Sequence, residues 1–162
     1  MDRAVHEVSA PLSVLLVEDD DADALLVSEH FADIEGSSGP SVTLQRARSL
    51  AEADDPIDTV DCVLLDLALP DAQGFDALKR VLRPEGPAVV VLTGRRDEAL
   101  GVRAVAAGAQ DYLLKDTVDG PVLSRAVRYA VERVRWERVH RQLWDAQIRA
   151  EVNRQERLHP ER

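Results

Sequence analysis

Four short apolar runs in this sequence each end on polar or charged side chains. The residues that end the runs are Glu18, Asp19, Asp20, Asp66, Thr93 and Lys115. Buried parallel strands have this continuous apolar pattern, and the carboxyl ends of such strands meet at one edge of a sheet. We therefore expect carboxylates, a hydroxyl and an ammonium group to gather there. Such a set suits a metal ion and a phosphoryl group.

The first of these positions is a cluster of adjacent carboxylates. Three carboxylates in a row, at 18–20, repel one another unless a cation lies near them, which favours a site for a hard divalent ion. Mg²⁺ is the expected ion, because it takes one or two carboxylates beside water and phosphate oxygens, and Asp19 and Asp66 supply such a pair. Asp21 and Asp23 are interpreted as the acidic first turn of the following helix, where the helix dipole favours negative charge.

Asp66 is the residue of this set with the chemistry of a nucleophile. It follows three apolar residues, and a carboxylate at the end of a buried strand needs a cation or hydrogen bonds to offset its burial. A carboxylate can attack phosphorus and form an acyl phosphate. Because phosphoryl transfer depends on positioning and charge neutralisation, the metal ion and Lys115 would supply most of the catalysis. Thr93 would donate a hydrogen bond to a phosphoryl oxygen.

Lys115 is an exception to the arginine usage of the chain. The sequence contains 18 arginines and two lysines, Lys79 and Lys115. A compact ammonium at a strand end, where a planar guanidinium does not fit, explains this exception. The alternative is a surface lysine retained by chance.

Segments with strand and helix patterns alternate along the chain, which predicts the α/β class, with a parallel sheet covered by helices on both faces. The expected strands are 13–18, 42–47, 62–66, 88–93 and 111–115. The expected helices are 22–34, a short helix capped by Ser49 that ends before Pro56, 75–82, 97–107, and one from 118 almost to the end.

The last expected helix is too long for a small domain. A helix of ~40 residues is ~60 Å long, so its distal part is expected to project. Apolar residues within 122–131 form a wide stripe suited to packing on the sheet, whereas later ones recur at alternating spacings of three and four, as in a coiled-coil seam. A single amphipathic helix that folds back on its own body is the alternative. The seam positions are Trp136, Val139, Leu143, Ala146, Ala150 and Asn153.

Length and hydropathy predict how the chain is organised. Its 162 residues fit one domain with an appendage: 1–12 as a flexible N-terminal segment, 13–133 as the domain and 134–162 as a helical linker. No apolar run approaches the ~18 residues of a membrane span, and the N-terminus lacks the apolar core of a signal peptide. A cytoplasmic protein without membrane contact is therefore expected.

Charge and cysteine content exclude further classes. The formal net charge is -10, and the acidic excess lies before residue 117, so the domain should repel nucleic acid. Arginines of the later segment alternate with acidic and apolar residues, which is typical of a solvated helix face. Cys62 is the single cysteine and lies in an apolar run, which indicates a buried structural thiol and excludes an intrachain disulfide.

Four motifs in order make the segment from Ser13 to Arg133 resemble the receiver domain of two-component response regulators. They are LLVEDD at 15–20, VLLDLALPDAQG at 63–74, VVLTG at 90–94 and DYLLK at 111–115. The resemblance implies a flavodoxin-like fold with five strands in the order 2-1-3-4-5. It also implies a signalling switch that catalyses only its own phosphorylation and dephosphorylation, and is otherwise not an enzyme.

The resemblance also assigns roles to individual residues. It implies that Asp66 accepts a phosphoryl group from a histidine kinase or phosphotransfer protein, and that Thr93 and Lys115 bind that group. Tyr112 would be an aromatic switch that turns inward when Thr93 moves. The Mg²⁺ ligands implied are Glu18, Asp19, Asp66 and the backbone carbonyl of Ala68.

Three positions depart from the family pattern. Asp116 stands where proline commonly follows the lysine, often through a cis peptide, so the geometry of this loop is left open. Gly94 replaces a more frequent alanine and should do no harm. Ala68 cannot hydrogen-bond an attacking water, which predicts slow hydrolysis of phosphorylated Asp66.

The output is expected to pass through the long helix, because no helix-turn-helix pattern follows residue 133. The segment from Asp111 onward resembles receivers whose helical linker leads to an effector, notably PP2C-like phosphatases and, less often, cyclic-dinucleotide enzymes. A homodimer through this helix is the expected assembly, without direct DNA binding. One alternative is a receiver-like docking module that is never phosphorylated. A haloacid-dehalogenase-type enzyme is another, but it needs a second acid at Ala68.

Overall fold

A five-stranded parallel sheet organises the first part of the chain. The computed structural model describes residues 10–36, 41–94 and 97–158, so most of the predicted flexible segment 1–12 lies outside the described residues. The strand order is β2-β1-β3-β4-β5, as expected. The strands are β1 (Leu12–Val17), β2 (Val42–Ala47), β3 (Cys62–Leu65), β4 (Ala88–Thr93) and β5 (Asp111–Leu114).

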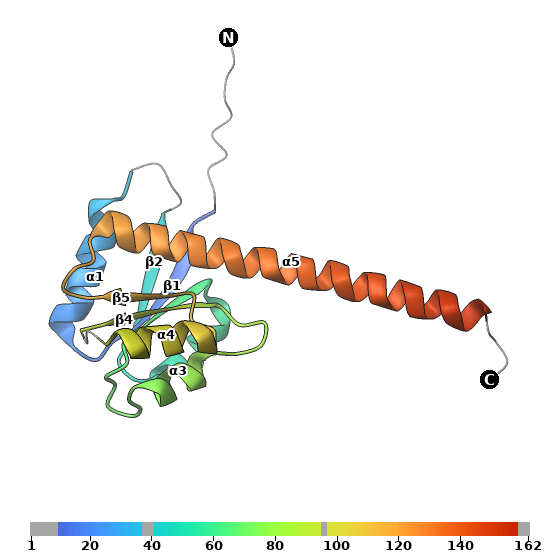
Figure 1. Cartoon of the computed structure of the whole chain (residues 1–162). Coiled ribbons are helices and arrows are strands. Elements are labelled where there is room, and N and C mark those ends of the chain that lie inside the picture. Colours follow the sequence, from blue (N-terminus) through green and yellow to red (C-terminus); the bar gives the residue numbers. More distant parts are fainter. Residues whose placement is uncertain (1–9, 37–40, 95–96, 159–162) are drawn as a thin grey trace, which may run out of the picture. The chain divides into compact units, whose positions relative to one another are not determined.

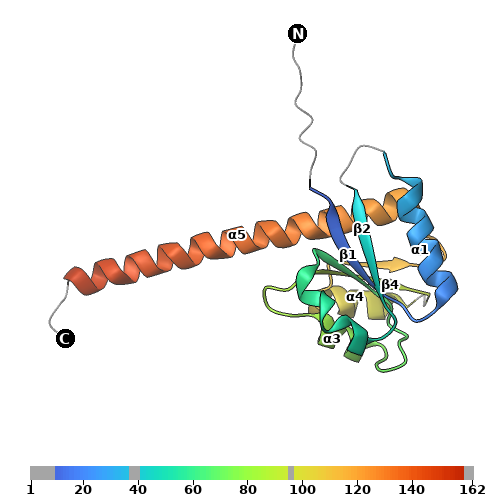
Figure 2. The ribbon, with the colours of Figure 1, turned by 180° about the vertical axis from the view of Figure 1, so that it is seen from behind.

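Helices cover both faces of this sheet. Figures 1 and 2 show α1 beside the first turns of α5 on one face, and α3 and α4 on the other. The predicted short helix before Pro56 is followed by a 3-10 turn that the sequence pattern did not indicate. The helices are α1 (Asp21–Asp33), α2 (Leu50–Ala53), η1 (Pro56–Thr59), α3 (Phe75–Val81), α4 (Glu98–Ala107) and α5 (Gly120–Leu158).

The apolar runs form the core, as their continuity predicts for strands covered on both faces. All six residues of β4 and all four of β3 are buried. Alternate strand residues, among them Leu15, Val63 and Val91, form one cluster together with Leu78 of α3 and Ala104 of α4. The buried strands therefore hold the residues that follow them at a rigid edge.

Side-chain caps determine where α1 and α5 begin. The Asp20 carboxylate accepts a hydrogen bond from the Asp23 amide at the start of α1. Asp119 likewise accepts from the Val122 amide at 2.9 Å, so α5 begins at Gly120 rather than at 118. Gly108 ends α4 with a φ of 125°, a conformation that suits glycine.

The described chain forms two compact units, one that ends at Val131 and one that begins at Glu132. The second unit consists of the later turns of α5, and it carries large apolar side chains that are half or more exposed. These are Trp136, Val139, Leu143, Trp144, Ile148 and Leu158. Among the described residues, no helix has the length and apolar character needed to cross a membrane.

Candidate functional site

The three adjacent carboxylates after β1, at 18–20, have different surroundings and different partners. Pairing with β2 continues one residue past the strand, since the Glu18 amide donates to the Ala47 carbonyl at 2.9 Å. The Glu18 side chain is buried and its Oε1 accepts the Asp20 amide at 3.0 Å, whereas Asp19 is exposed. Asp20 caps α1. The carboxylates at 18–20 thus divide between the site edge and the helix cap.

Asp66 lies beside this loop because β3 pairs with β1. Its amide donates to the Val17 carbonyl at 3.1 Å, and the residue is only 5% exposed. One carboxylate oxygen accepts the Ala68 amide at 3.2 Å, and the other lies 3.2 Å from the Lys115 ammonium. The carboxylate therefore has partners that offset its burial, as expected for a strand-end acid.

Lys115 joins three carboxylates at the end of β5. Its Nζ lies 2.5 Å from Glu18 Oε2, 2.8 Å from Asp23 Oδ2 and 3.2 Å from Asp66 Oδ2. Burial acts to lower the pKa of Lys115, but hydrogen bonds to Asp23 and Glu18 and the charge of Asp66 outweigh it, so the pKa lies above its ordinary value. Lys115 therefore stays positively charged at the centre of the site.

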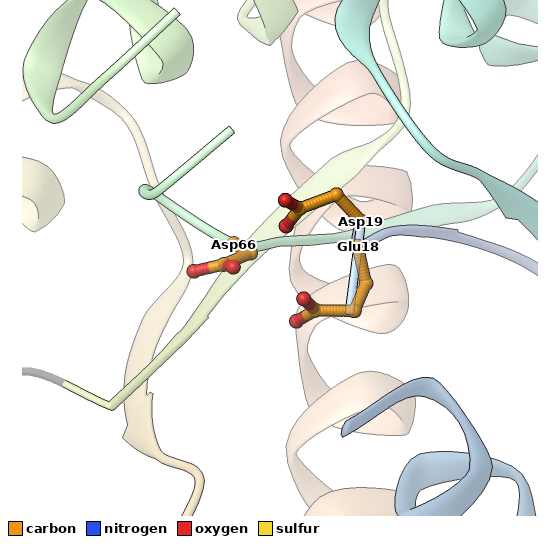
Figure 3. Close-up of side chains that lie close together, drawn as sticks. All are labelled: Glu18, Asp19 and Asp66. Atoms are coloured by element: carbon orange, nitrogen blue, oxygen red, sulfur yellow. The ribbon is translucent and has the colours of Figure 1, made fainter. Parts of the chain in front are cut away.

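Burial raises the pKa of the Glu18 carboxyl, although Lys115 and the Asp20 amide act to lower it. One carboxylate oxygen each from Glu18, Asp19 and Asp66 lie within 4.8 Å of one another. Figure 3 shows these three side chains close together where β1 and β3 end. Clustered carboxylate oxygens are the donor set that hard divalent cations prefer, so the residues present fit such an ion.

Thr93 at the end of β4 and Ala68 in the loop after β3 lie on either side of this set. Thr93 ends β4, is 1% exposed, and its carbonyl accepts the Lys115 amide at 2.9 Å. Ala68 is exposed and its amide binds the Asp66 carboxylate. The loop closes where the Gly74 amide donates to the Leu67 carbonyl at 2.7 Å, and the φ of 58° at Gly74 explains the glycine.

Tyr112 lies on β5 and faces α4 rather than the carboxylates. A Cβ at Gly101 of α4 would lie 3.1 Å from the Tyr112 ring, so the ring packs directly on the glycine backbone. The ring is partly exposed. The peptide bonds of the described residues are trans, including the one between Lys115 and Asp116.

Sequence reasoning missed two site residues. Asp23 was expected to serve only as part of an acidic first turn, but its carboxylate binds Lys115. Arg46 of β2 donates to the Glu18 carbonyl at 3.0 Å, to the Asp19 carbonyl at 3.1 Å and to the Asp21 carboxylate at 2.8 Å. We call these three contacts the Arg46 clamp. The sequence signal for it was an arginine at the end of a predicted edge strand, beside an acidic loop.

Comparison with known proteins identifies the family. The model of the response regulator receiver domain matches residues 14–128. The chain belongs to the response regulator receiver domain family. This receiver is 36% identical over 124 residues to the transcriptional regulatory protein FixJ of Azorhizobium caulinodans, covering 75% of the chain and 56% of FixJ.

Two further similar proteins support this family assignment. The transcriptional regulatory protein AfsQ1 of Streptomyces coelicolor is 31% identical over 128 residues, covering 75% of the chain and 52% of AfsQ1. A crystal structure of a response regulator receiver domain protein from Clostridium thermocellum superposes with a TM-score of 0.61 at 26% identity, covering 77% of this receiver and 98% of that chain. The receiver spans about half the length of the curated relatives it matches.

Proposed function

We propose that this receiver is a phosphorylation switch in which Asp66 accepts a phosphoryl group from a sensor histidine kinase or phosphotransfer protein. The observation that carries the proposal is the Asp66 carboxylate itself, which is buried among two further carboxylates and lies 3.2 Å from a charged lysine. A docking surface alone needs no such set. The domain spans 13–133 in this proposal and functions in the cytoplasm.

The proposed transfer uses the Asp66 carboxylate as nucleophile. A carboxylate oxygen forms a bond to phosphorus while the bond from phosphorus to the donor nitrogen breaks, and the donor keeps that electron pair. Lys115 and Thr93 would bind the phosphoryl oxygens. Hydrolysis later replaces the Asp66 oxygen on phosphorus by water and restores the carboxylate.

Mg²⁺ is the proposed cofactor. Glu18, Asp19, Asp66 and the Ala68 carbonyl would hold it. Bound there, the ion would neutralise negative charge on the phosphoryl group. The excess of carboxylates over the single Lys115 ammonium supports this assignment.

Acetyl phosphate tests the acceptor directly. With Mg²⁺, the wild-type protein should acquire the mass of one phosphoryl group, because acetyl phosphate needs no kinase to supply it. Asp66→Asn should acquire none. Asp76→Asn, in the exposed first turn of α3, is the matched control and should behave like wild type. An unmodified wild-type protein would favour the docking-module alternative.

Ala68 is proposed to make the phosphorylated state long-lived. Its methyl group cannot orient a water molecule toward phosphorus, so hydrolysis lacks one source of positioning. Ala68→Asn should shorten the lifetime of phosphorylated Asp66 about tenfold, because one hydrogen bond to the attacking water contributes about 1.4 kcal/mol, which corresponds to a factor of ten in rate. A wild-type lifetime of seconds in Mg²⁺ would contradict this reasoning.

Thr93 and Tyr112 are proposed to transmit the switch. The contact of the Tyr112 ring with the Gly101 backbone supports this, because an inward turn of the ring would remove that contact and alter the surface between β5 and α4. Substituting Tyr112 by leucine should therefore leave phosphorylation intact while abolishing the change at α4, which amide exchange can follow.

The segment 134–162 is proposed to act as a linker that pairs two copies and leads to an effector such as a PP2C-like phosphatase. Its support is the exposed apolar side chains, among them Trp136 at 62% and Leu143 at 57%. Water-exposed groups of this size mark interaction surfaces. Sedimentation should show a dimer that truncation after Arg133 abolishes; a truncated protein that remains dimeric would refute pairing through the helix.

A further inference from the structure

Asp23 and the proposed phosphoacceptor Asp66 both pair with Lys115, and Asp23 does so from the solvent-exposed side. It lies in the first turn of α1, and its Oδ2 is 2.8 Å from Lys115 Nζ, closer than Asp66 Oδ2 at 3.2 Å. The Asp23 side chain is 42% exposed, whereas those of Glu18 and Asp66 are 2% and 6% exposed. Of the three carboxylates around this lysine, Asp23 is the most exposed to solvent.

The ammonium group has no donor to spare for a new anion. Lysine carries three N–H donors, and Lys115 faces three carboxylates. An oxygen of an incoming phosphoryl group must therefore share a donor with one of them or displace it. Leaving Glu18 unpaired would strand a buried charge, whereas water can solvate Asp23. Asp23 is therefore the partner that competes with the phosphoryl group for the lysine.

The negative charge of Asp23 also opposes phosphorylation by electrostatic repulsion, without direct contact with the phosphoryl group. The carboxylate oxygens of Asp23 and Asp66 lie within 3.2 Å of the same nitrogen. Phosphorylation replaces one negative charge at Asp66 by about -1.5 to -2. A nearby like charge makes that increase less favourable, and the same charge attracts a cation.

We propose that Asp23 is a positioning residue that shares Lys115 with the acceptor site and thereby restrains phosphorylation of Asp66. This inference rests on the function proposed above. The proposal predicts that Asp23 affects the two ligands of the site in opposite directions. Its negative charge strengthens the binding of Mg²⁺ and weakens the binding of a phosphoryl-like anion. General damage to the site would weaken both.

The test compares Asp23→Asn with Asp33→Asn, which removes one charge from the exposed opposite end of the same helix. Asp23→Asn should bind Mg²⁺ about fivefold more weakly and, at saturating Mg²⁺, bind fluoroberyllate about fivefold more tightly, as expected for a half-exposed charge at this range. Asp33→Asn should stay within twofold of wild type for both ions. Asp23→Glu, which keeps the charge, should restore wild-type values.

The lysine itself provides a second measurement. The chain has two lysines, so ammonium NMR signals are few, and Lys79→Arg assigns the one from Lys115. In wild type the Lys115 signal should be sharp, because its N–H groups are hydrogen-bonded. In Asp23→Ala, which removes one acceptor, it should broaden through faster exchange with water.

The outcomes separate this inference from the function on which it rests. If wild type binds no fluoroberyllate and takes no phosphoryl group from acetyl phosphate, the proposed function fails. If wild type does both and Asp23→Asn binds fluoroberyllate equally or more weakly, the acceptor role stands and the restraint by Asp23 is refuted. An unchanged Lys115 signal in Asp23→Ala would refute the positioning role.

Discussion

Replacing Arg46 by methionine should weaken Mg²⁺ binding although Arg46 is not itself an ion ligand. Its guanidinium donates to the backbone carbonyls of Glu18 and Asp19, and so holds in place two residues whose carboxylates form the proposed metal site. Methionine retains much of the apolar stem but has no donors. The loop after β1 would then have to be ordered by the ion itself.

The size of the effect follows from these two contacts. Hydrogen bonds from a charged donor contribute about 1.5–3 kcal/mol when buried. The Arg46 side chain is 26% exposed, so we assign about 1 kcal/mol to each. Losing both corresponds to roughly 30-fold weaker binding. Removing a positive charge beside a cation site acts in the opposite direction, so we expect a net loss of about tenfold.

Arg48→Met is the matched control. Arg48 pairs with the Asp21 carboxylate at 2.8 Å, as Arg46 does, but no contact joins it to the Glu18 or Asp19 carbonyl. If only the loss of a positive charge mattered, both variants would bind Mg²⁺ slightly more tightly than wild type. The Arg46 clamp instead predicts weaker binding in Arg46→Met only. Amide NMR shifts at the ends of β1 and β3 give the dissociation constants. Equal changes in the two variants would refute the clamp.

Three further predictions concern stability and reactivity. Gly120→Ala should lower the free energy of unfolding by about 1–3 kcal/mol in urea, because the new Cβ would lie 2.6 Å from the His30 carbonyl oxygen. Gly94→Ala should not, because no atom of the described residues lies within 4 Å of its new Cβ. Burial raises the pKa of the Cys62 thiol to about 12, so a disulfide reagent at neutral pH should label it only after urea unfolds the chain. Backbone hydrogen bonds from α2 lower the pKa of the Asp71 carboxyl below its ordinary value of 3.8, so its contribution to stability is fully present above pH 3.8 and is lost as the pH falls through the lower pKa of the folded state. Asp71→Ala should therefore flatten the acid limb of a pH series of urea unfolding, and an unchanged limb would contradict this.

The order of the elements was predictable because their patterns are local. A buried parallel strand is a continuous apolar run whatever its neighbours are, and caps such as Ser49 and Asp97 act within three residues. The helix beginning at Gly120 differs from expectation by two residues, because a single cap, Asp119, decides where it begins, and the 3-10 turn at Pro56 was not indicated by the sequence pattern. Strand ends of a parallel sheet meet at one edge, so Asp66 and Lys115 were also predictable as neighbours.

The partners of these residues were not predictable from the sequence. Asp21 and Asp23 both fit an acidic first turn, yet one pairs with Arg46 and Arg48 and the other with Lys115, 92 positions away. Residues two apart in a helix project in directions about 200° apart, and what each meets depends on where neighbouring strands place their side chains. The sequence by itself determined which chemical groups stand at the strand ends. Only the tertiary structure decided which charges meet there, because such contacts depend on how α1 packs against the sheet.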